Sequence, residues 1–196
     1  AGGGEGLFDD ASPAEGQVDR DTALAALRPV LSGPSEPLII AATDPLLSIF
    51  RSVSSHDAIA ADAIRTSPVR ITPSELAEAA RPILDGLHAQ TIAEVHSLFS
   101  ARENEGRATT QIGRAARAAT FGAVDTLLID IDEVVAGTVD ETTGEVTFAD
   151  KEGAKSYGVV DEIASRVLAS RGRVLAVRRE DIVQGESLAA ILRYAV

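Results

Sequence analysis

The stretch GAVDTLLIDI, residues 122–131, decides the fold of the second half of the chain. It contains the short apolar run Leu127, Leu128 and Ile129, which predicts a strand buried through these residues. An alanine-rich helix over about 108–120, with Thr109 or Thr110 as its cap, leads into this stretch. We therefore predict a central strand over 124–131 that the chain enters directly from a helix.

The elements downstream of this strand alternate between strand and helix. We predict an acidic hairpin over 138–148 and then a helix over 157–170. A strand over 173–177, a turn over 185–189 and a last strand over 190–195 follow. Gly144 marks the hairpin turn, and Gly172 is expected to end the helix. This alternation predicts an α/β sandwich in which helices pack on a mixed sheet.

The upstream half is more helical. Thr72-Pro73-Ser74-Glu75 is a capping box and predicts the start of a long helix that reaches about Asn104. Pro82 lies inside that pattern, so we expect a kink or a break there. Further upstream we predict a helix, a buried strand, and a helix that starts at Asp44-Pro45 with Asp44 as cap; the first two cover 19–32 and 38–42.

Composition excludes several classes of protein. The 196 residues include no cysteine, which excludes disulfide frameworks, thiolate metal sites and cysteine nucleophiles. The net charge of −12 argues against non-specific DNA coating. We find no apolar run near the roughly 20 residues of a membrane span and no secretory signal, and expect a cytoplasmic protein without membrane contact.

The chain divides into three predicted parts: 1–18 is a flexible Gly-rich segment, 19–105 an α/β region, and 106–196 an α/β sandwich. The chain lacks methionine and begins AGGGEG, so we expect it to be a piece of a longer protein. Residues 1–105 hold 7 basic and 16 acidic side chains, and residues 106–196 hold 11 and 14. The second part is therefore the better candidate for contact with nucleic acid.

Arginines supply the candidate RNA contacts of this second part. Arg114 and Arg117 are three residues apart and share one face of the predicted helix. The full candidate set is Arg107, Arg114, Arg117, Arg173, Arg178 and Arg179. Aromatic residues make up only 4% of the chain, so we expect contacts to the RNA backbone rather than base stacking.

Other chemistry has weaker support. The Gly-rich start, Gly2, Gly3, Gly4 and Glu5, is the one weak catalytic candidate, because such a loop lets backbone approach a substrate closely. Carboxylates flank the predicted central strand at Asp125, Asp130, Asp132 and Glu133, but without a partner at metal-ligand spacing. His56, His88 and His96 form no ligand pair. We expect neither a metal nor a cofactor.

The second part resembles the third domain of the archaeo-eukaryotic class-I peptide release factors and of Pelota. The matching pieces are a strand of the type GAVxxLLI, a helix, a strand, a loop with Gln, Glu and Gly, and the ending AILRY. They stand at 122–130, 159–170, 173–177, 184–186 and 190–194. The upstream part is similar, less strongly, to the family's middle domain, and the whole is most similar to its bacterial relatives.

This resemblance implies a truncated RNase H-like middle domain and a third domain with the fold of kink-turn-binding ribosomal proteins. It also implies action at the ribosome and, for the third domain, a translational GTPase partner. The Gln of the family's GGQ loop is absent, since Gly4 or Glu5 takes its place. The codon-reading N-terminal domain has no counterpart in this sequence.

We therefore expect a ribosome-associated module that binds the ribosome, rRNA or tRNA rather than catalysing a reaction. A peptidyl-tRNA or RNA hydrolase is one alternative. A protein-interaction scaffold that uses the acidic hairpin over 138–148 is another.

Overall fold

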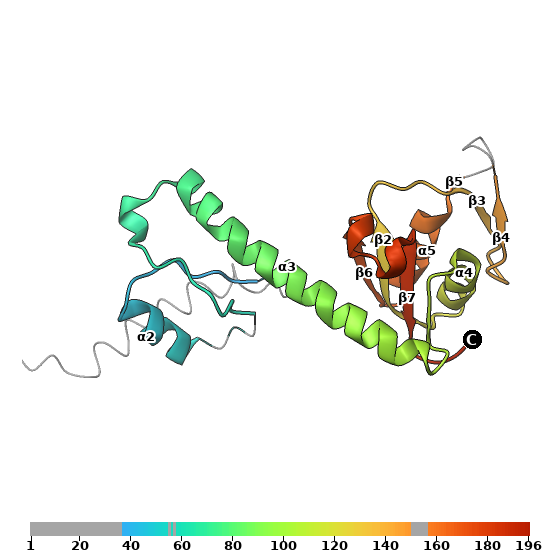
Figure 1. Ribbon diagram of the computed structural model, residues 1–196, viewed down its shortest axis with the longest axis horizontal. Helices are drawn as coiled ribbons and strands as arrows, with labels where there is room; N and C mark the ends of the chain where they lie inside the picture. Colours follow the sequence, from blue (N-terminus) through green and yellow to red (C-terminus); the bar gives the residue numbers. More distant parts are fainter. Residues whose placement is uncertain (1–36, 55, 57, 150–156) are drawn as a thin grey trace, which may run out of the picture. The chain divides into compact units, whose positions relative to one another are not determined.

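The computed structural model describes residues 37–54, 56, 58–149 and 157–196, and the chain forms two compact units, Ala1–His88 and Ala89–Val196 (Figure 1). The predicted helix over 19–32 and the Gly-rich start lie outside the described residues. The predicted limits of the three parts stay predictions; the compact units divide inside a long helix. No helix in the described ranges combines the length and apolarity that a bilayer crossing requires.

The predicted buried strand over 38–42 is wrong in detail. Two isolated parallel bridges, Leu38 to Ile59 and Ala41 to Ile64, take its place, and the segment is only half-buried. Backbone bonds such as Ala60 N–H to the Leu38 carbonyl, at 3.0 Å, hold each bridge. The chain bends at 61–62 between the bridges, so a continuous ladder does not form.

Helix α2 (Leu46–Val53) confirms the helix expected after Asp44-Pro45, but its start differs from the prediction. Pro45 is the N-cap residue and no side chain caps the helix. The Asp44 carboxylate instead accepts hydrogen bonds from the Ser48 hydroxyl at 3.0 Å and from Arg65 at 2.8 Å. Asp44 thus ties the helix to Arg65 rather than to its own backbone N–H groups.

Helix α3 (Pro73–Glu103) confirms the capping box. The Glu75 carboxylate accepts from the Thr72 N–H at 2.9 Å and from its hydroxyl at 2.7 Å, and these bonds lower the pKa of Glu75. The helix continues through Pro82 without the predicted break. Glu78 and Pro82 are both exposed, so water can replace the N–H that Pro82 lacks.

The second unit is built on a mixed four-stranded sheet in the order β1-β7-β2-β6. Its central strand β2 (Val124–Asp130) is the predicted one, and it pairs parallel to β6 (Arg173–Val177) and antiparallel to β7 (Leu188–Leu192). The short edge strand β1 (Ala108–Thr109) pairs antiparallel to β7. The mixed α/β class is confirmed.

Several predicted boundaries of this unit are wrong by a few residues. Residues 108–109 are strand rather than helix, because they pair with β7, and α4 (Ile112–Thr120) begins later, after Gln111 and without a side-chain cap. The last strand is 188–192 rather than 190–195. The turn predicted over 185–189 comes earlier, as the 3₁₀ turns η2 (Arg179–Asp181) and η3 (Val183–Gly185).

Helices cover both faces of this sheet, which is therefore the middle layer of an α/β/α sandwich (Figure 1). On one face α4 and α5 (Val159–Ala169) pack over a fully buried Leu127. On the other face Ile92, Val95 and Phe99 of α3 pack over Leu128. Because neighbouring residues of β2 point to opposite cores, its apolar run is continuous.

A second, three-stranded sheet has the order β4-β3-β5. Strands β3 (Ala136–Val139) and β4 (Val146–Phe148) form the predicted hairpin, and β5 (Tyr157–Gly158) pairs with the other edge of β3. Gly144 has a φ of +71° in the hairpin turn, as expected for a position that favours glycine.

The end of α5 corrects one prediction. The left-handed residue there is Arg171, with a φ of 60°, rather than Gly172. Position 172 has no room for a side chain. A Cβ there would lie 2.9 Å from the Val124 carbonyl oxygen and 2.5 Å from a methyl carbon of Val167.

We predict that Gly144→Ala lowers the free energy of unfolding by about 1–3 kcal/mol. Its φ is positive, and its Cβ would lie 2.7 Å from the Cα of Arg117. Urea denaturation measures the change. Gly113→Ala is the matched control, since its Cβ meets nothing within 4 Å and alanine favours the helix. Equal losses in the two variants would contradict the explanation.

Candidate functional site

The six candidate arginines all lie in the second unit; Arg114 and Arg117 are on α4, and the other four lie at two opposite ends of the sheet. Arg173 begins β6, whereas Arg178 and Arg179 follow its last residue, roughly 16 Å along the strand. Arg107 lies at the same end as Arg173, because its carbonyl accepts from the Leu192 N–H at 2.8 Å and Leu192 pairs with the start of β2. The structure therefore brings Arg107 and Arg173 to one end and separates them from Arg178 and Arg179.

Arg107 is largely engaged within the protein. Its guanidinium forms an ion pair with Glu105 at 3.1 Å and donates to the carbonyl oxygen of Arg193. The carboxylate of Glu105 is also paired with Arg102 at 2.9 Å. Hydrogen bonding to Arg102, with a smaller contribution from Arg107, lowers the pKa of Glu105. Arg107 thus links α3 to the C-terminal segment.

Arg114 and Arg117 are exposed on α4, as their spacing predicts. Arg114 Nη2 donates to the Gly106 carbonyl at 2.9 Å, which directs it toward the Arg107 end. Arg117 lines a groove of about 650 Å³ between α4 and the hairpin, together with Phe121 and Phe148. The side chains of Arg114 and Arg117 therefore lie in different environments.

Arg179 faces the opposite end of the sheet. It forms an ion pair with Glu133 at 3.2 Å, and its Nε donates to the Gly185 carbonyl at 2.8 Å. Arg178 and Arg173 are exposed, and the structure gives their side chains no hydrogen bond or ion pair within the described ranges.

Sequence reasoning misses two residues of the ending AILRY, Arg193 and Tyr194, as candidates for the site. Arg193 donates to the carbonyl oxygens of Gly122 at 2.9 Å, Ser170 at 3.3 Å and Arg171 at 3.1 Å. These bonds connect the C-terminal segment to the turns before β2 and β6. The Tyr194 hydroxyl donates to the Phe121 carbonyl at 2.9 Å. The unbroken Arg-Tyr pair after an apolar strand is the signal that could have identified them.

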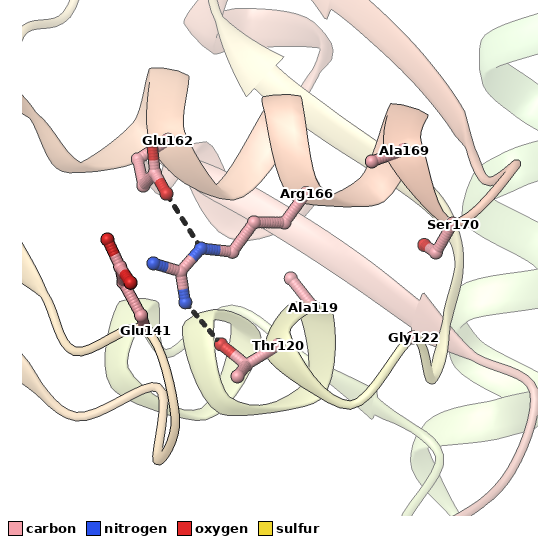
Figure 2. Close-up of a pocket in the computed structure, with 8 residues that line it drawn as sticks. All are labelled: Ala119, Thr120, Gly122, Glu141, Glu162, Arg166, Ala169 and Ser170. Carbon is pink, nitrogen blue, oxygen red and sulfur yellow. Dashed lines mark hydrogen bonds and ion pairs between the residues drawn. The ribbon is translucent and has the colours of Figure 1, made fainter.

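A hollow of about 470 Å³ lies between α4, α5 and the hairpin, and Arg166 is its central side chain (Figure 2). The guanidinium donates to Glu162 at 2.8 Å and to the Thr120 hydroxyl at 2.6 Å. It also donates to the carbonyl oxygens of Asp140 at 3.0 Å and Val139 at 3.2 Å. With its side chain 15% exposed, Arg166 is a structural clamp rather than a free ligand group.

The carboxylates and histidines form no centre in the described part of the chain. Asp130 is buried and accepts the Asp132 N–H at 3.0 Å. His96 Nε2 lies 2.7 Å from the Asp181 carbonyl oxygen. Among the described residues no three His, Asp or Glu side chains gather as a metal site would require. The weak catalytic candidate, Gly2, Gly3, Gly4 and Glu5, lies outside the described residues, which begin at Pro37.

The fold is similar to that of Pelota and Dom34. An archaeal Pelota, from a structure described as "Model of ribosome-bound archaeal Pelota and ABCE1", superposes with a TM-score of 0.59 at 20% identity. That match covers 95% of this chain and 51% of the Pelota chain. Dom34 of S. cerevisiae superposes with a TM-score of 0.58 at 15% identity, over 98% of this chain and 56% of its own. This chain thus spans about half the length of either.

The sequence itself, apart from the fold, matches the model of a protein family. Residues 17–90 match the model of "Bacterial archaeo-eukaryotic release factor family 11". This confirms the resemblance to bacterial relatives of the release factors, and the match falls on the upstream half, where the motifs are weaker. None of the curated proteins compared matches the sequence.

We predict that Arg166→Leu lowers the free energy of unfolding by about 2–3 kcal/mol, because it removes a charged donor from two carbonyl oxygens and a hydroxyl. Thermal or urea unfolding measures the loss. Glu162→Gln is the control and should cost less than about 0.5 kcal/mol, as expected of a helical i,i+4 pair. If the two variants lose the same amount, the ion pair rather than the carbonyl contacts holds the elements together.

The hairpin turn should lose order in acid. The Asp140 carboxylate accepts the N–H groups of Thr143 at 2.7 Å and Thr142 at 2.9 Å, and these bonds hold the pKa of Asp140 below its ordinary 3.8. The lowered pKa means that this stabilisation is complete above pH 3.8 and is lost as the pH falls through the folded value. NMR shifts of the Thr142 and Thr143 amides follow the loss. Asp140→Asn should abolish that titration step.

Proposed function

We propose that this chain is a ribosome-associated, translation-related module that acts by binding rather than by catalysis. The observation that carries the proposal is the release-factor family match over 17–90. The superposition of nearly the whole chain on Pelota and Dom34 supports it at the level of the fold.

Binding rather than hydrolysis is supported by the residues themselves. The family's GGQ loop is not reproduced in the segment GGGE over 2–5. The second unit offers exposed arginines on an otherwise acidic protein, which suits docking onto an RNA surface. Among the six arginines named from the sequence, the proposed contacts to rRNA or tRNA are the exposed Arg114, Arg117, Arg173 and Arg178, because Arg107 and Arg179 are ion-paired within the protein.

Partners of the two superposed proteins indicate where to look. The Pelota structure is ribosome-bound and includes ABCE1, and Dom34 is described as "interacting with Hbs1". We propose the ribosome as the first partner of this chain and a translational GTPase as a second partner of the unit 89–196. Both belong to the cytoplasm.

Co-sedimentation with purified 70S ribosomes across a salt series tests the proposal. The chain should pellet with ribosomes at low salt and leave the pellet as salt rises, because phosphate contacts release counterions. A chain that stays in the supernatant at low salt would overturn the proposed function.

Charge reversal on α4 tests the proposed role of its arginines. Arg114→Glu with Arg117→Glu should weaken ribosome binding several-fold and reduce the slope of log K against log salt by about 2, because each arginine that binds a phosphate contributes about 1 to that slope. The same co-sedimentation assay measures both. Unchanged binding and slope would remove the two α4 arginines from the interface.

A further inference from the structure

Five arginines gather at the end of the sheet where β2 and β6 begin. We call this set the arginine end; it consists of Arg107, Arg114, Arg171, Arg173 and Arg193. Hydrogen bonds connect them: Arg107 donates to the carbonyl of Arg193, and Arg193 donates to the carbonyl of Arg171 at 3.1 Å. Arg114 donates to the carbonyl of Gly106, the neighbour of Arg107.

These arginines have two different states. Arg107 and Arg193 donate to carbonyl oxygens of the protein, and Arg107 also pairs with Glu105, so their role at this end is structural. Arg171 and Arg173 are exposed, and within the described residues their side chains have no hydrogen bond or ion pair. Two guanidinium groups are thus held on a rigid frame with their donors available.

The local charge is positive on a protein whose net charge is −12. The carboxylates at this end are Glu105, already paired with Arg102 and Arg107, and Asp125, which lies 3.9 Å from Arg193. Glu103 ends α3 nearby. The arginines therefore exceed the carboxylates, and an anionic ligand is favoured here over the rest of the surface.

One exposed aromatic ring, that of Tyr194, lies at this end of the sheet. The Tyr194 hydroxyl donates to the Phe121 carbonyl at 2.9 Å, and the next carbonyl along the chain, that of Gly122, accepts from Arg193 at 2.9 Å. Tyr194 is 51% exposed. Exposed rings next to cationic side chains are what proteins use to hold unpaired bases.

We propose that the arginine end, with Tyr194, binds an unpaired RNA segment: phosphates lie on Arg171 and Arg173, and a base stacks on Tyr194. This inference rests on the proposed function and names the RNA surface and the kind of RNA. An exposed tyrosine ring at the same end as unengaged guanidinium groups favours unpaired RNA over a duplex, whose bases are already stacked. An acidic protein surface could pair with the arginines, but it has no base that would stack on the ring of Tyr194.

Fluorescence anisotropy with a labelled ten-nucleotide oligoadenylate tests the site on the full chain. Arg171→Asn with Arg173→Gln should weaken binding about tenfold and reduce the salt slope by about 1.4, since each single-strand phosphate contact contributes about 0.7. Asparagine suits the positive φ of Arg171, so the fold is kept. The matched control is Arg70→Gln with Arg81→Gln, which removes the same charge from exposed positions in the first unit and should leave binding within about twofold of wild type.

Tyr194 provides an independent measurement. Tyr194→Leu should weaken oligoadenylate binding at least about fivefold without changing the salt slope, because stacking carries no counterion release. Tyr194→Phe keeps the ring and removes only the bond to Phe121, so it should retain binding. A decrease in Tyr194→Phe equal to that in Tyr194→Leu would assign Tyr194 a structural role and overturn the stacking.

The outcomes separate this site from the proposed function. If the wild-type chain pellets with ribosomes but the arginine-end variants bind oligoadenylate and ribosomes as well as the control, the site is wrong and the function stands. If those variants lose ribosome binding while oligoadenylate binding is absent even in the wild type, the arginine end contacts a ribosomal surface other than unpaired RNA, and this proposal fails. If the wild type binds no ribosomes, the proposed function fails whatever the oligonucleotide result.

Discussion

The second unit depends on the burial of β2 on both faces. Leu127 and Leu128 are both fully buried, one under α4 and α5 and the other under the end of α3. A strand with this environment must have helices on both sides of its sheet, and it must be paired on both edges, as it is by β6 and β7. The layer structure follows from that requirement.

Hydrogen bonds from two partly buried arginines then fix the connections around these layers. Arg193 closes the turn before β2 and the turn before β6 through carbonyl oxygens, and Arg166 joins α5 to α4 and to the hairpin. Each guanidinium offers five donors in a planar fork, which suits several carbonyl acceptors better than one ammonium group does. Because these arginines are consumed inside the fold, the number of arginines in the sequence overstates the positive surface.

The sequence predicts the elements that rest on local signals. The central strand, the hairpin with Gly144, the capping box at Thr72 and the helix over Val159–Ala169 all follow from periodicity or turn chemistry within a few residues. Prediction fails where pairing partners decide the outcome. Residues 108–109 become strand because β7 lies beside them, and residues 38–42 fail to form a strand because the partner segment bends.

The same limit explains the site. Helical spacing places Arg114 and Arg117 on one exposed face, and the predicted strand over 173–177 already separates Arg173 from Arg178. The sequence does not show which arginines are held by internal carbonyl oxygens, as Arg107 and Arg193 are. Aromatic content argues against stacking when it is averaged over the chain. The fold nevertheless brings Tyr194 to the end of α4, because Arg193 and Tyr194 follow β7 and bind the carbonyl oxygens of Gly122 and Phe121. The proposed binding surface depends on tertiary proximity, and composition alone cannot reveal it.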